Sequence, residues 1–350
     1  MKIVLFCEQK YAINILQPIE NEAIKEGGHS VIWYVHTINI PDFPLKNEVK
    51  WTDSIQEIYD FSPDVIFVPC NIVPYYLPGV KVQIFHGYAA EKKDHWVIRR
   101  YFDTYFTQGP FFTKGFEALA KEYKDFEVVE TGWPRQDWIY ENLHTFDPEK
   151  NTLLQKYQKS KLVLYAPTFS PSLTSLPFIK EGLIKLVEER DVLLILKFHP
   201  LTRKEWMEEY KKLAQEYKNI LWVEDHNITK YQLMADVMIS DTSSTVYEFL
   251  LLDKPVITYK TIAKDIYWQD IQTPSNLPEA FDLVFEDEEL ASKRKWIIAN
   301  YDPYLDGKVC HRMLNAARDY ISRHGVPKKR RLNLWRKYTS IKKFGKIKRK

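Results

Sequence analysis

The chain consists of short, continuous apolar runs that alternate with segments whose apolar residues recur every three or four positions. The first run is Lys2–Cys7, and the segment that follows, Ile13–Glu26, has helical spacing and ends at Gly27-Gly28. Continuous apolar runs are typical of parallel strands covered on both faces. We therefore predict a βαβ series in the first part of the chain, with further strands at SVIWYV, DVIFVP and KVQIFHG.

The same alternation restarts after residue 150. Strands are predicted at KLVLYAPT, VLLILKFHP, NILWVED, DVMISD and PVITYK, with helices at 178–189, 203–217 and 244–252. A linker helix is expected to begin at Asp147-Pro148, and a helical pattern at 306–322 closes the globular part. Two successive βαβ series predict an α/β protein with two doubly wound, Rossmann-like domains.

The expected boundaries place the first domain at 1–150, the second at 151–325 and a separate tail at 326–350. A length of 350 residues, with 45% hydrophobic and 28% charged residues, suits two globular cores. The sequence has no apolar run of about 18 residues, so it predicts no transmembrane helix.

The cysteines are few and widely spaced, and they form no CxxC pair. This pattern fits a reducing compartment and argues against a disulfide framework and a zinc site. The three residues are Cys7, Cys70 and Cys310.

The charge is unevenly distributed, although the net charge is only +3. Residues 326–350 hold twelve of the 50 Lys and Arg and no acid, which leaves a net charge of about −9 on the rest. The tail also contains Trp335 and Tyr338, and a basic amphipathic segment of this kind suits an anionic membrane surface. Nucleic acid is the competing partner, and a disordered solubilising tail is the third interpretation. We favour the membrane because the rest of the chain is acidic.

Candidate chemistry lies just after the predicted strands, where ligands bind in open α/β sheets. His86 follows the strand at 81–85 and precedes Gly87, which lets the backbone turn and a ligand approach. Its ordinary pKa near neutrality suits a general base that acts on an acceptor hydroxyl. The alternative is a loop histidine bonded to a neighbour.

A second histidine ends a strand in the second half of the chain. His199 follows the strand at 192–198, and Pro200 stiffens the exit from it. There it is placed to donate a hydrogen bond to a phosphate oxygen and stabilise a leaving group. Two histidines at corresponding positions of two half-sheets are a stronger signal than either one alone.

A run of hydroxyl residues follows the predicted strand DVMISD and precedes a helix. Thr242, Ser243 and Ser244 are placed to bind a phosphate with hydroxyls and backbone N–H groups, although ordinary helix capping and turn chemistry also explain them. Glu248, one turn into the helix, either accepts from ribose hydroxyls or is a surface carboxylate.

Two further strand ends carry candidate contacts. After the strand at 126–130, Arg135 is a candidate phosphate ligand and Asp137 a candidate helix cap, or the two form a structural pair. After the strand KLVLYAPT, a base or ribose pocket is expected at Tyr165, Pro167 and Thr168. The sequence contains no Walker A loop, no GxGxxG after its first strand and no nucleophile elbow, and it shows no carboxylate pair for a metal.

Taken in order, these motifs resemble the CDP-glycerol glycerophosphotransferase family, which includes teichoic acid primases and polymerases and related capsule enzymes. The resemblance covers about residues 80–320. The motifs that carry it are His86-Gly87, Gly132–Asp137, Tyr165-Ala166-Pro167-Thr168, His199-Pro200, Ile239-Ser240-Asp241 with Ser243-Ser244, and Asp306-Gly307-Lys308 with Arg312.

The resemblance implies a GT-B fold, in which two domains face each other across a cleft. It also implies transfer of glycerol phosphate, or a related polyol phosphate, from a CDP-activated donor to a hydroxyl of a lipid-linked or polymeric glycan in cell-wall or capsule synthesis. In this reading His86 is the base, while His199, Ser243 and Ser244 hold the donor phosphates. No further cofactor is expected, and the enzyme is expected in the cytoplasm, peripheral on the inner face of the cell membrane.

Two alternatives remain at this stage. One is a GT-B glycosyltransferase that uses a nucleotide sugar for surface polysaccharide synthesis. The other is a membrane-tethered binding subunit of a polysaccharide assembly complex. Phe85 stands where the family often has Trp. Transfer of ribitol phosphate, instead of glycerol phosphate, is therefore a further alternative.

Overall fold

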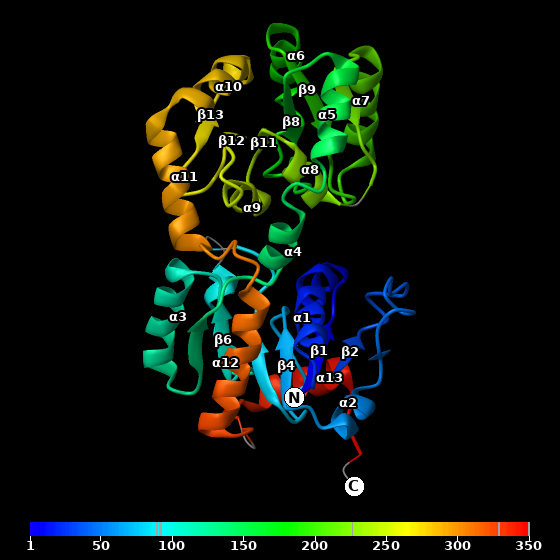
Figure 1. Cartoon of the computed structure of the whole chain (residues 1–350), viewed down its shortest axis with the longest axis vertical. Coiled ribbons are helices and arrows are strands. Elements are labelled where there is room, and N and C mark those ends of the chain that lie inside the picture. The colour runs from blue at the N-terminus through cyan, green and yellow to red at the C-terminus, as the bar shows by residue number, and fades with distance from the viewer. Residues whose placement is uncertain (89, 91–92, 226, 328–329, 349–350) are drawn as a thin grey trace. The chain divides into compact units, whose positions relative to one another are not determined.

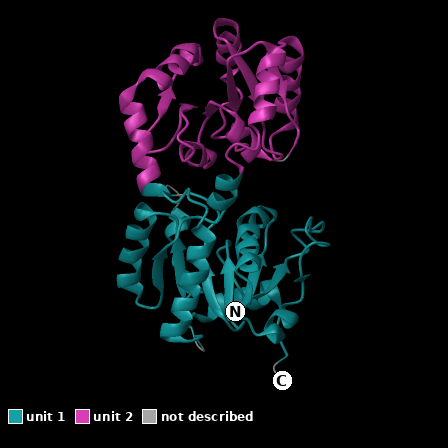
Figure 2. Cartoon of the chain, in the orientation of Figure 1, with its two compact units in different colours: residues 1–141, 300–350 teal, residues 142–299 magenta. Residues whose placement is uncertain are grey.

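The chain forms two compact units, each built around its own parallel sheet (Figure 1, Figure 2). The computed structural model describes residues 1–88, 90, 93–225, 227–327 and 330–348. Unit 1 comprises Met1–Glu141 and Asn300–Lys350, and unit 2 comprises Asn142–Ala299. The predicted α/β class with two doubly wound domains is therefore confirmed.

Unit 1 contains a parallel sheet with the strand order β3-β2-β1-β4-β5-β6-β7 among the described residues. Its strands are β1 (Lys2–Cys7), β2 (Ser30–Val35), β3 (Trp51–Thr52), β4 (Val65–Val68), β5 (Val80–Gln83), β6 (Thr104–Thr107) and β7 (Glu127–Glu130). Its helices are α1 (Ile13–Glu26), α2 (Ile55–Phe61), α3 (Pro110–Tyr123), α4 (Arg135–Asn142), α12 (Val309–His324) and α13 (Leu334–Phe344), with short 3₁₀ turns at Lys10–Ala12 and Lys93–Trp96. The central strand β1 has no exposed surface from Ile3 to Cys7, as its continuous apolar run predicts.

Unit 2 repeats the plan with the strand order β10-β9-β8-β11-β12-β13. Its strands are β8 (Lys161–Tyr165), β9 (Val192–Leu196), β10 (Ile220–Trp222), β11 (Val237–Ser240), β12 (Val256–Tyr259) and β13 (Gln269–Ile271). Its helices are α5 (Asp147–Tyr157), α6 (Lys180–Glu189), α7 (Lys204–Glu216), α8 (Ile228–Met234), α9 (Thr245–Leu250), α10 (Leu277–Glu286) and α11 (Glu288–Tyr301), with a 3₁₀ turn at Pro274–Asn276. Each segment predicted as a strand in this half contains one of the strands β8 to β12, and the predicted linker helix is α5, whereas β13 was not predicted.

The observed division differs from the expected boundaries in the last part of the chain. Residues 300–325 were expected in the second domain, but α12 packs against α1 and β5 of unit 1. The reason is its apolar stripe, which includes Val309, Met313 and Leu314 and is completely buried. The chain therefore crosses from unit 1 to unit 2 and back again.

The structure of the described part of residues 326–350 also differs from the prediction of a separate tail, because this part packs on unit 1. Helix α13 lies behind β1 and β2 in Figure 1, and Phe344 at its end makes edge contacts with Phe6 (ring centroids 5.5 Å apart) and Tyr34 (6.3 Å). Upstream of the helix, Arg330 donates to the carboxylate of Asp103. Lys328, Lys329, Arg349 and Lys350 lie outside the described residues.

The position of α13 has a simple cause in the topology. Residues 69–79, which connect β4 to β5, form turns instead of a crossover helix. The sheet face over β1 and β4 would therefore be uncovered, and Leu332 and Phe344 join the buried cluster on that face. The described part of the tail is an integral layer of unit 1. In the described part of the chain, no helix combines the length and apolar character needed to cross a membrane.

Candidate functional site

The loop that carries His86 extends from the end of β5 and has a strained backbone. Phe85 has a φ of +57°, a left-handed conformation that is rare for a bulky residue. Its ring is held between His95 (centroids 4.8 Å apart) and Phe116 (4.9 Å). Since such strain persists only where packing maintains it, the loop conformation is imposed by unit 1. Phe85 is buried, whereas the side chain that follows it, His86, is exposed.

The bonding of His86 identifies which ring nitrogen can take a proton. Nδ1 lies 3.1 Å from the carbonyl oxygen of Pro69, which accepts only, so Nδ1 carries hydrogen. In the neutral ring the lone pair is then on Nε2. The same carbonyl accepts from Nε2 of Gln83 at 3.3 Å, and the carbonyl of Gly87 accepts from Nε2 of Gln108 at 3.0 Å. His86 therefore has the tautomer of a general base at Nε2.

In unit 2, His199 follows β9 and has the opposite tautomer. Its Nδ1 accepts the backbone N–H of Leu201 at 3.1 Å, so the proton of the neutral ring is on Nε2. The ring stacks on Phe169, with centroids 4.4 Å apart. Burial, together with the charge of Lys197, lowers the pKa of His199, which favours the neutral form. His199 is thus arranged as a hydrogen-bond donor at Nε2.

The loop after β11 is braced by a buried carboxylate. Asp241 has no exposed surface and accepts from the backbone N–H of Thr168 at 2.9 Å. It also accepts from both the N–H (2.8 Å) and the hydroxyl (2.9 Å) of Ser175. Burial raises the pKa of Asp241 to about 6, while these hydrogen bonds favour its charged form. Asp241 therefore joins the loop after β8 to the loop after β11.

The three hydroxyl residues that follow Asp241 lie at the carboxyl edge of the unit 2 sheet. Thr242 accepts from the N–H of Ile262 at 3.1 Å, and the hydroxyls of Ser243 and Thr245 are 2.8 Å apart. Ser244, the residue before α9, is exposed and makes no side-chain cap. Ser243 and Ser244 thus lie at a strand end, where parallel sheets bind ligands.

The predicted nucleotide pocket is only partly consistent with the structure. Tyr165 has no exposed surface, and its hydroxyl lies 2.9 Å from that of Ser175. It points into the core because it belongs to the buried face of β8, so it cannot contact a nucleotide, and the prediction is corrected. Pro167 is buried, while Thr168 and Glu248 are half-buried. Thr168 and Glu248 remain candidates.

The turn that begins at Thr131 belongs to unit 1 and needs glycine. Gly132 has a φ of +89°, and a Cβ there would come within 2.9 Å of Cβ of Tyr304. Asp137 accepts from the backbone N–H groups of Val309 (2.9 Å) and Cys310 (2.7 Å). It therefore caps α12, a helix far along the chain.

The candidate phosphate ligand of this turn is Arg135, the first residue of α4. Its guanidinium lies 5.4 Å from the ring centroid of Trp133. Arg135 and His86 thus belong to unit 1, whereas His199, Ser243 and Ser244 belong to unit 2.

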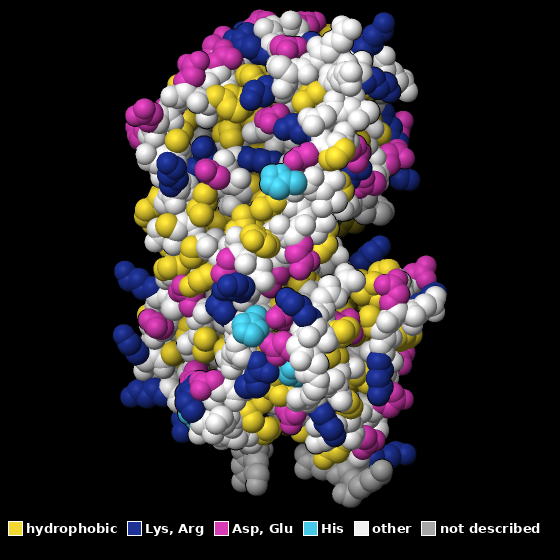
Figure 3. Space-filling view, in the orientation of Figure 1, with side chains coloured by type: hydrophobic (Ala, Val, Ile, Leu, Met, Phe, Trp, Pro, Cys, Tyr) yellow, Lys and Arg dark blue, Asp and Glu magenta, His cyan; other side chains and the backbone are white. Residues whose placement is uncertain are grey.

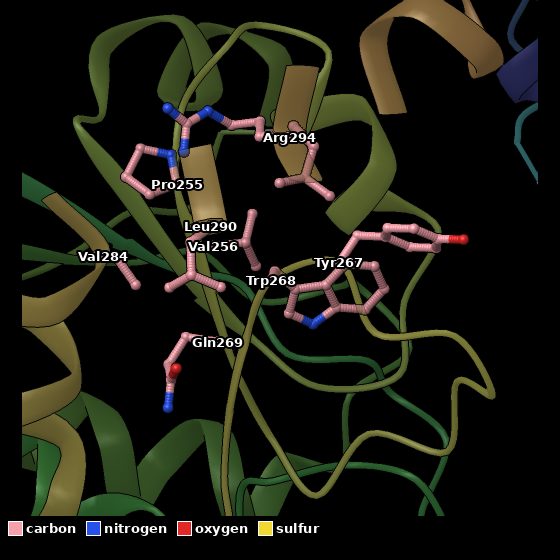
Figure 4. Close-up of a pocket in the computed structure, with 9 residues that line it drawn as sticks. Pro255, Val256, Tyr267, Trp268, Gln269, Val284, Leu290 and Arg294 are labelled. Atoms are coloured by element: carbon pink, nitrogen blue, oxygen red, sulfur yellow. The ribbon is translucent and has the colours of Figure 1, made fainter. Parts of the chain in front are cut away.

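The small pocket of Figure 4 lies elsewhere in unit 2, and the predicted site residues do not line it. Pro255, Val256 and Gln269 come from the starts of β12 and β13, and Figure 4 shows Arg294 above them. Ligands bind at the opposite, carboxyl ends of parallel strands. We therefore interpret the pocket as a packing defect.

In unit 1, ligand atoms of Glu22, Glu26 and His311 lie within 4.8 Å of one another. Glu26 is also paired with Arg318 (2.9 Å) and with His29 (3.2 Å). The guanidinium of Arg318 already supplies positive charge, so the cluster is better explained as an ion-pair network than as a metal site.

Sequence reasoning missed the residues that fix the His86 loop. Gln108 comes directly after β6 and precedes Gly109-Pro110, so its place at a strand end was a usable signal. The strain at Phe85 had no such signal, because a positive φ at a bulky residue depends on its tertiary contacts.

The fold is shared with solved structures. The wall teichoic acid polymerase TagF matches with a TM-score of 0.66 at 15% identity, over 92% of this chain and 89% of that one. MnaA of S. aureus, in a co-structure with UDP, matches with a TM-score of 0.68 at 15% identity, over 92% and 97%. These likenesses confirm the predicted GT-B pair of Rossmann-like units.

The sequence comparison then defines the family. Residues 79–270, more than half of the chain, match the model of CDP-Glycerol:Poly(glycerophosphate) glycerophosphotransferase. This chain belongs to that family.

Curated relatives are similar over part of their length. The teichoic acid glycerol-phosphate primase of Bacillus spizizenii is 34% identical over 41% of this chain and 38% of its own length. The corresponding primase of Bacillus subtilis is 27% identical over 63% and 60%. A teichoic acid ribitol-phosphate polymerase of Staphylococcus aureus, TarK, is 24% identical over 57% and 42%. The chain thus spans between 38% and 60% of these relatives.

Proposed function

We propose that this chain is a transferase that moves glycerol phosphate, or a related polyol phosphate, from a CDP-activated donor to a hydroxyl of a lipid-linked or polymeric glycan. The glycan would belong to cell-wall teichoic acid or capsule polysaccharide. Family membership supports the reaction class. The observation that carries the proposal is the pair of opposite tautomers, with an acceptor nitrogen in His86 and a donor N–H in His199.

The reaction is an in-line displacement at the β-phosphorus of the donor. Nε2 of His86 takes the proton of the acceptor hydroxyl as its oxygen bonds to phosphorus, and the bond to the bridging oxygen breaks. CMP leaves, and Nε2–H of His199 stabilises the negative charge of the diphosphate.

The remaining candidates are assigned to donor binding. Thr242, Ser243 and Ser244 offer hydroxyls to the diphosphate, and Arg135 offers a positive charge. Thr168 and Glu248 are assigned to the nucleotide side, whereas Pro167 is buried. No cofactor takes part in this scheme.

A nucleotide-sugar glycosyltransferase is the second candidate, because MnaA, which has the same fold, is in a co-structure with UDP. The two candidates differ in what they release. We expect CMP release from CDP-glycerol or CDP-ribitol when a polyglycerol phosphate oligomer is the acceptor, and none from UDP- or GDP-sugars. Each donor is incubated with the full chain, and released nucleotides are separated by ion-exchange chromatography. Release of a nucleoside diphosphate from a nucleotide sugar alone would replace the proposal by its rival.

The proposal also places the enzyme in the cytoplasm, on the inner face of the cell membrane. Helix α13 supports this placement, because Leu334, Trp335 and Tyr338 are 82%, 70% and 56% exposed while its other face packs on the sheet. Basic Arg331 and Lys342 are also exposed. On the face shown in Figure 3, by contrast, Lys and Arg are interspersed with Asp and Glu. An apolar, aromatic surface with basic neighbours suits an anionic bilayer.

Replacing Trp335 and Tyr338 together with serine is expected to weaken binding to phosphatidylglycerol vesicles at least about tenfold, because two aromatic side chains no longer enter the interface. Co-sedimentation with vesicles measures this. Phe178→Ser is the matched control, since Phe178 is 60% exposed in unit 2. Equal binding by the control and the double variant, or tighter binding of duplex DNA than of vesicles, would refute the membrane assignment.

A further inference from the structure

The carboxylate of Asp302 connects two loops of unit 1. Its Oδ2 accepts from the hydroxyl of Tyr88 at 2.7 Å and from the backbone N–H of Trp133 at 3.0 Å. Tyr88 lies two residues after His86, and Trp133 lies two residues before Arg135. One oxygen atom thus bonds both the loop of the candidate base and the turn that precedes the candidate phosphate ligand.

The connection is buried and well packed. Asp302 is 2% exposed, Tyr88 1% and Trp133 2%. The rings of Tyr88 and Trp133 meet edge to face, with centroids 5.2 Å apart. Nε2 of Gln136 donates to the hydroxyl of Tyr88 at 3.1 Å, which leaves that hydroxyl's own proton for Asp302. Each member of the network is therefore oriented by a second contact.

Asp302 is the third residue after the chain returns from unit 2. Its Oδ1 accepts from the N–H of Tyr304 at 3.2 Å, which fixes the returning segment. Burial raises the pKa of Asp302 to about 7, and the hydrogen bonds from Tyr88 and the backbone oppose that rise. An ionisable group this deeply buried costs stability unless it is fully bonded, and Asp302 is bonded through both oxygens.

We propose that Asp302 is a positioning residue that acts through Tyr88 to fix the His86 loop. The inference rests on the proposed function, in which Nε2 of His86 takes the acceptor proton. Proton transfer requires the base to lie within hydrogen-bond distance of the hydroxyl, so a small displacement of the ring lowers the rate. The strained φ of Phe85 gives the loop a reason to relax when a restraint is removed.

The test is a double-mutant cycle on CMP release from the CDP-polyol donor that the wild-type chain uses. Tyr88→Phe removes the hydroxyl bond and keeps the ring, and we expect kcat to fall about tenfold with the donor KM within about twofold. Asp302→Asn should behave similarly, because it keeps the shape and removes the charged acceptor. In a His86→Ala background, adding Tyr88→Phe should change nothing, since the residue acts through His86.

Thermal unfolding of each variant separates an effect on positioning from an effect on folding. If Asp302→Asn does not fold, the kinetics of Tyr88→Phe alone decide the test. Tyr101→Phe is the matched control, because it removes a hydroxyl bonded to the carbonyl of Arg336 in the same unit. An unchanged kcat in Tyr88→Phe, or a full tenfold loss on top of His86→Ala, overturns the inference. If His86→Ala itself retains activity, the proposed function fails together with the inference. If only His86→Ala loses activity, the inference alone fails.

Discussion

Replacing His86 with alanine is expected to lower kcat for polyol phosphate transfer by about 10³-fold, within the range for loss of a general base. The ring donates through Nδ1 to Pro69, so Nε2 is the nitrogen that takes the proton. Alanine removes that acceptor without disturbing the donor's phosphate contacts. The donor KM is therefore expected to change little.

Release of CMP at saturating donor, followed over a range of acceptor concentrations, measures this effect. His144→Ala is the matched control, since the side chain of His144 is 87% exposed and pairs with Asp147 on the surface of unit 2. A loss of less than about tenfold in His86→Ala would be too small for a general base. The proton would then have another acceptor.

Replacing His199 with alanine is expected to lower kcat/KM by about 10²-fold, the cost of losing one preorganised donor to developing charge. The reason is specific to the tautomer. Nδ1 is occupied as an acceptor from Leu201, so the ring can only donate at Nε2. Glutamine can also donate through its side-chain amide, and His199→Gln should therefore recover part of the activity.

Steady-state kinetics of the two substitutions, with donor concentration varied, distinguish donation from packing. The ring also stacks on Phe169. If His199→Gln loses as much activity as His199→Ala, hydrogen-bond donation is disproved as the role of His199. Recovery of activity in a third variant, His199→Phe, would then assign the role to stacking on Phe169.

Strand-end positions were predictable because the burial of parallel strands leaves a direct signature in the sequence. The apolar run before His199 is β9, and the run before Ser243 is β11. The rule that ligands bind at carboxyl ends then directs attention to the residues that follow. This local reasoning located His86 and His199 without any knowledge of tertiary contacts.

Side-chain direction and long-range packing were not predictable in the same way. Tyr165 is the last residue of β8, and because side chains alternate between the two faces of a strand, its ring points into the core. Asp302 contacts Tyr88 and Trp133, which are distant in sequence, and no periodicity encodes such a contact. The composition of 326–350 indicated a basic amphipathic segment in a separate tail, but the uncovered sheet face that receives Phe344 is a property of the fold.

The return of the chain to unit 1 has a consequence for how the protein forms during synthesis. Residues 300–350 leave the ribosome after all of unit 2. The apolar sheet face around Phe6 in unit 1 therefore stays exposed until Phe344 has been synthesised. Unit 2, by contrast, is encoded without interruption and can fold first, as contiguous domains do. Premature termination within the last helix would therefore leave the earliest-made part of the protein incomplete, and exposed apolar surface of that kind promotes aggregation.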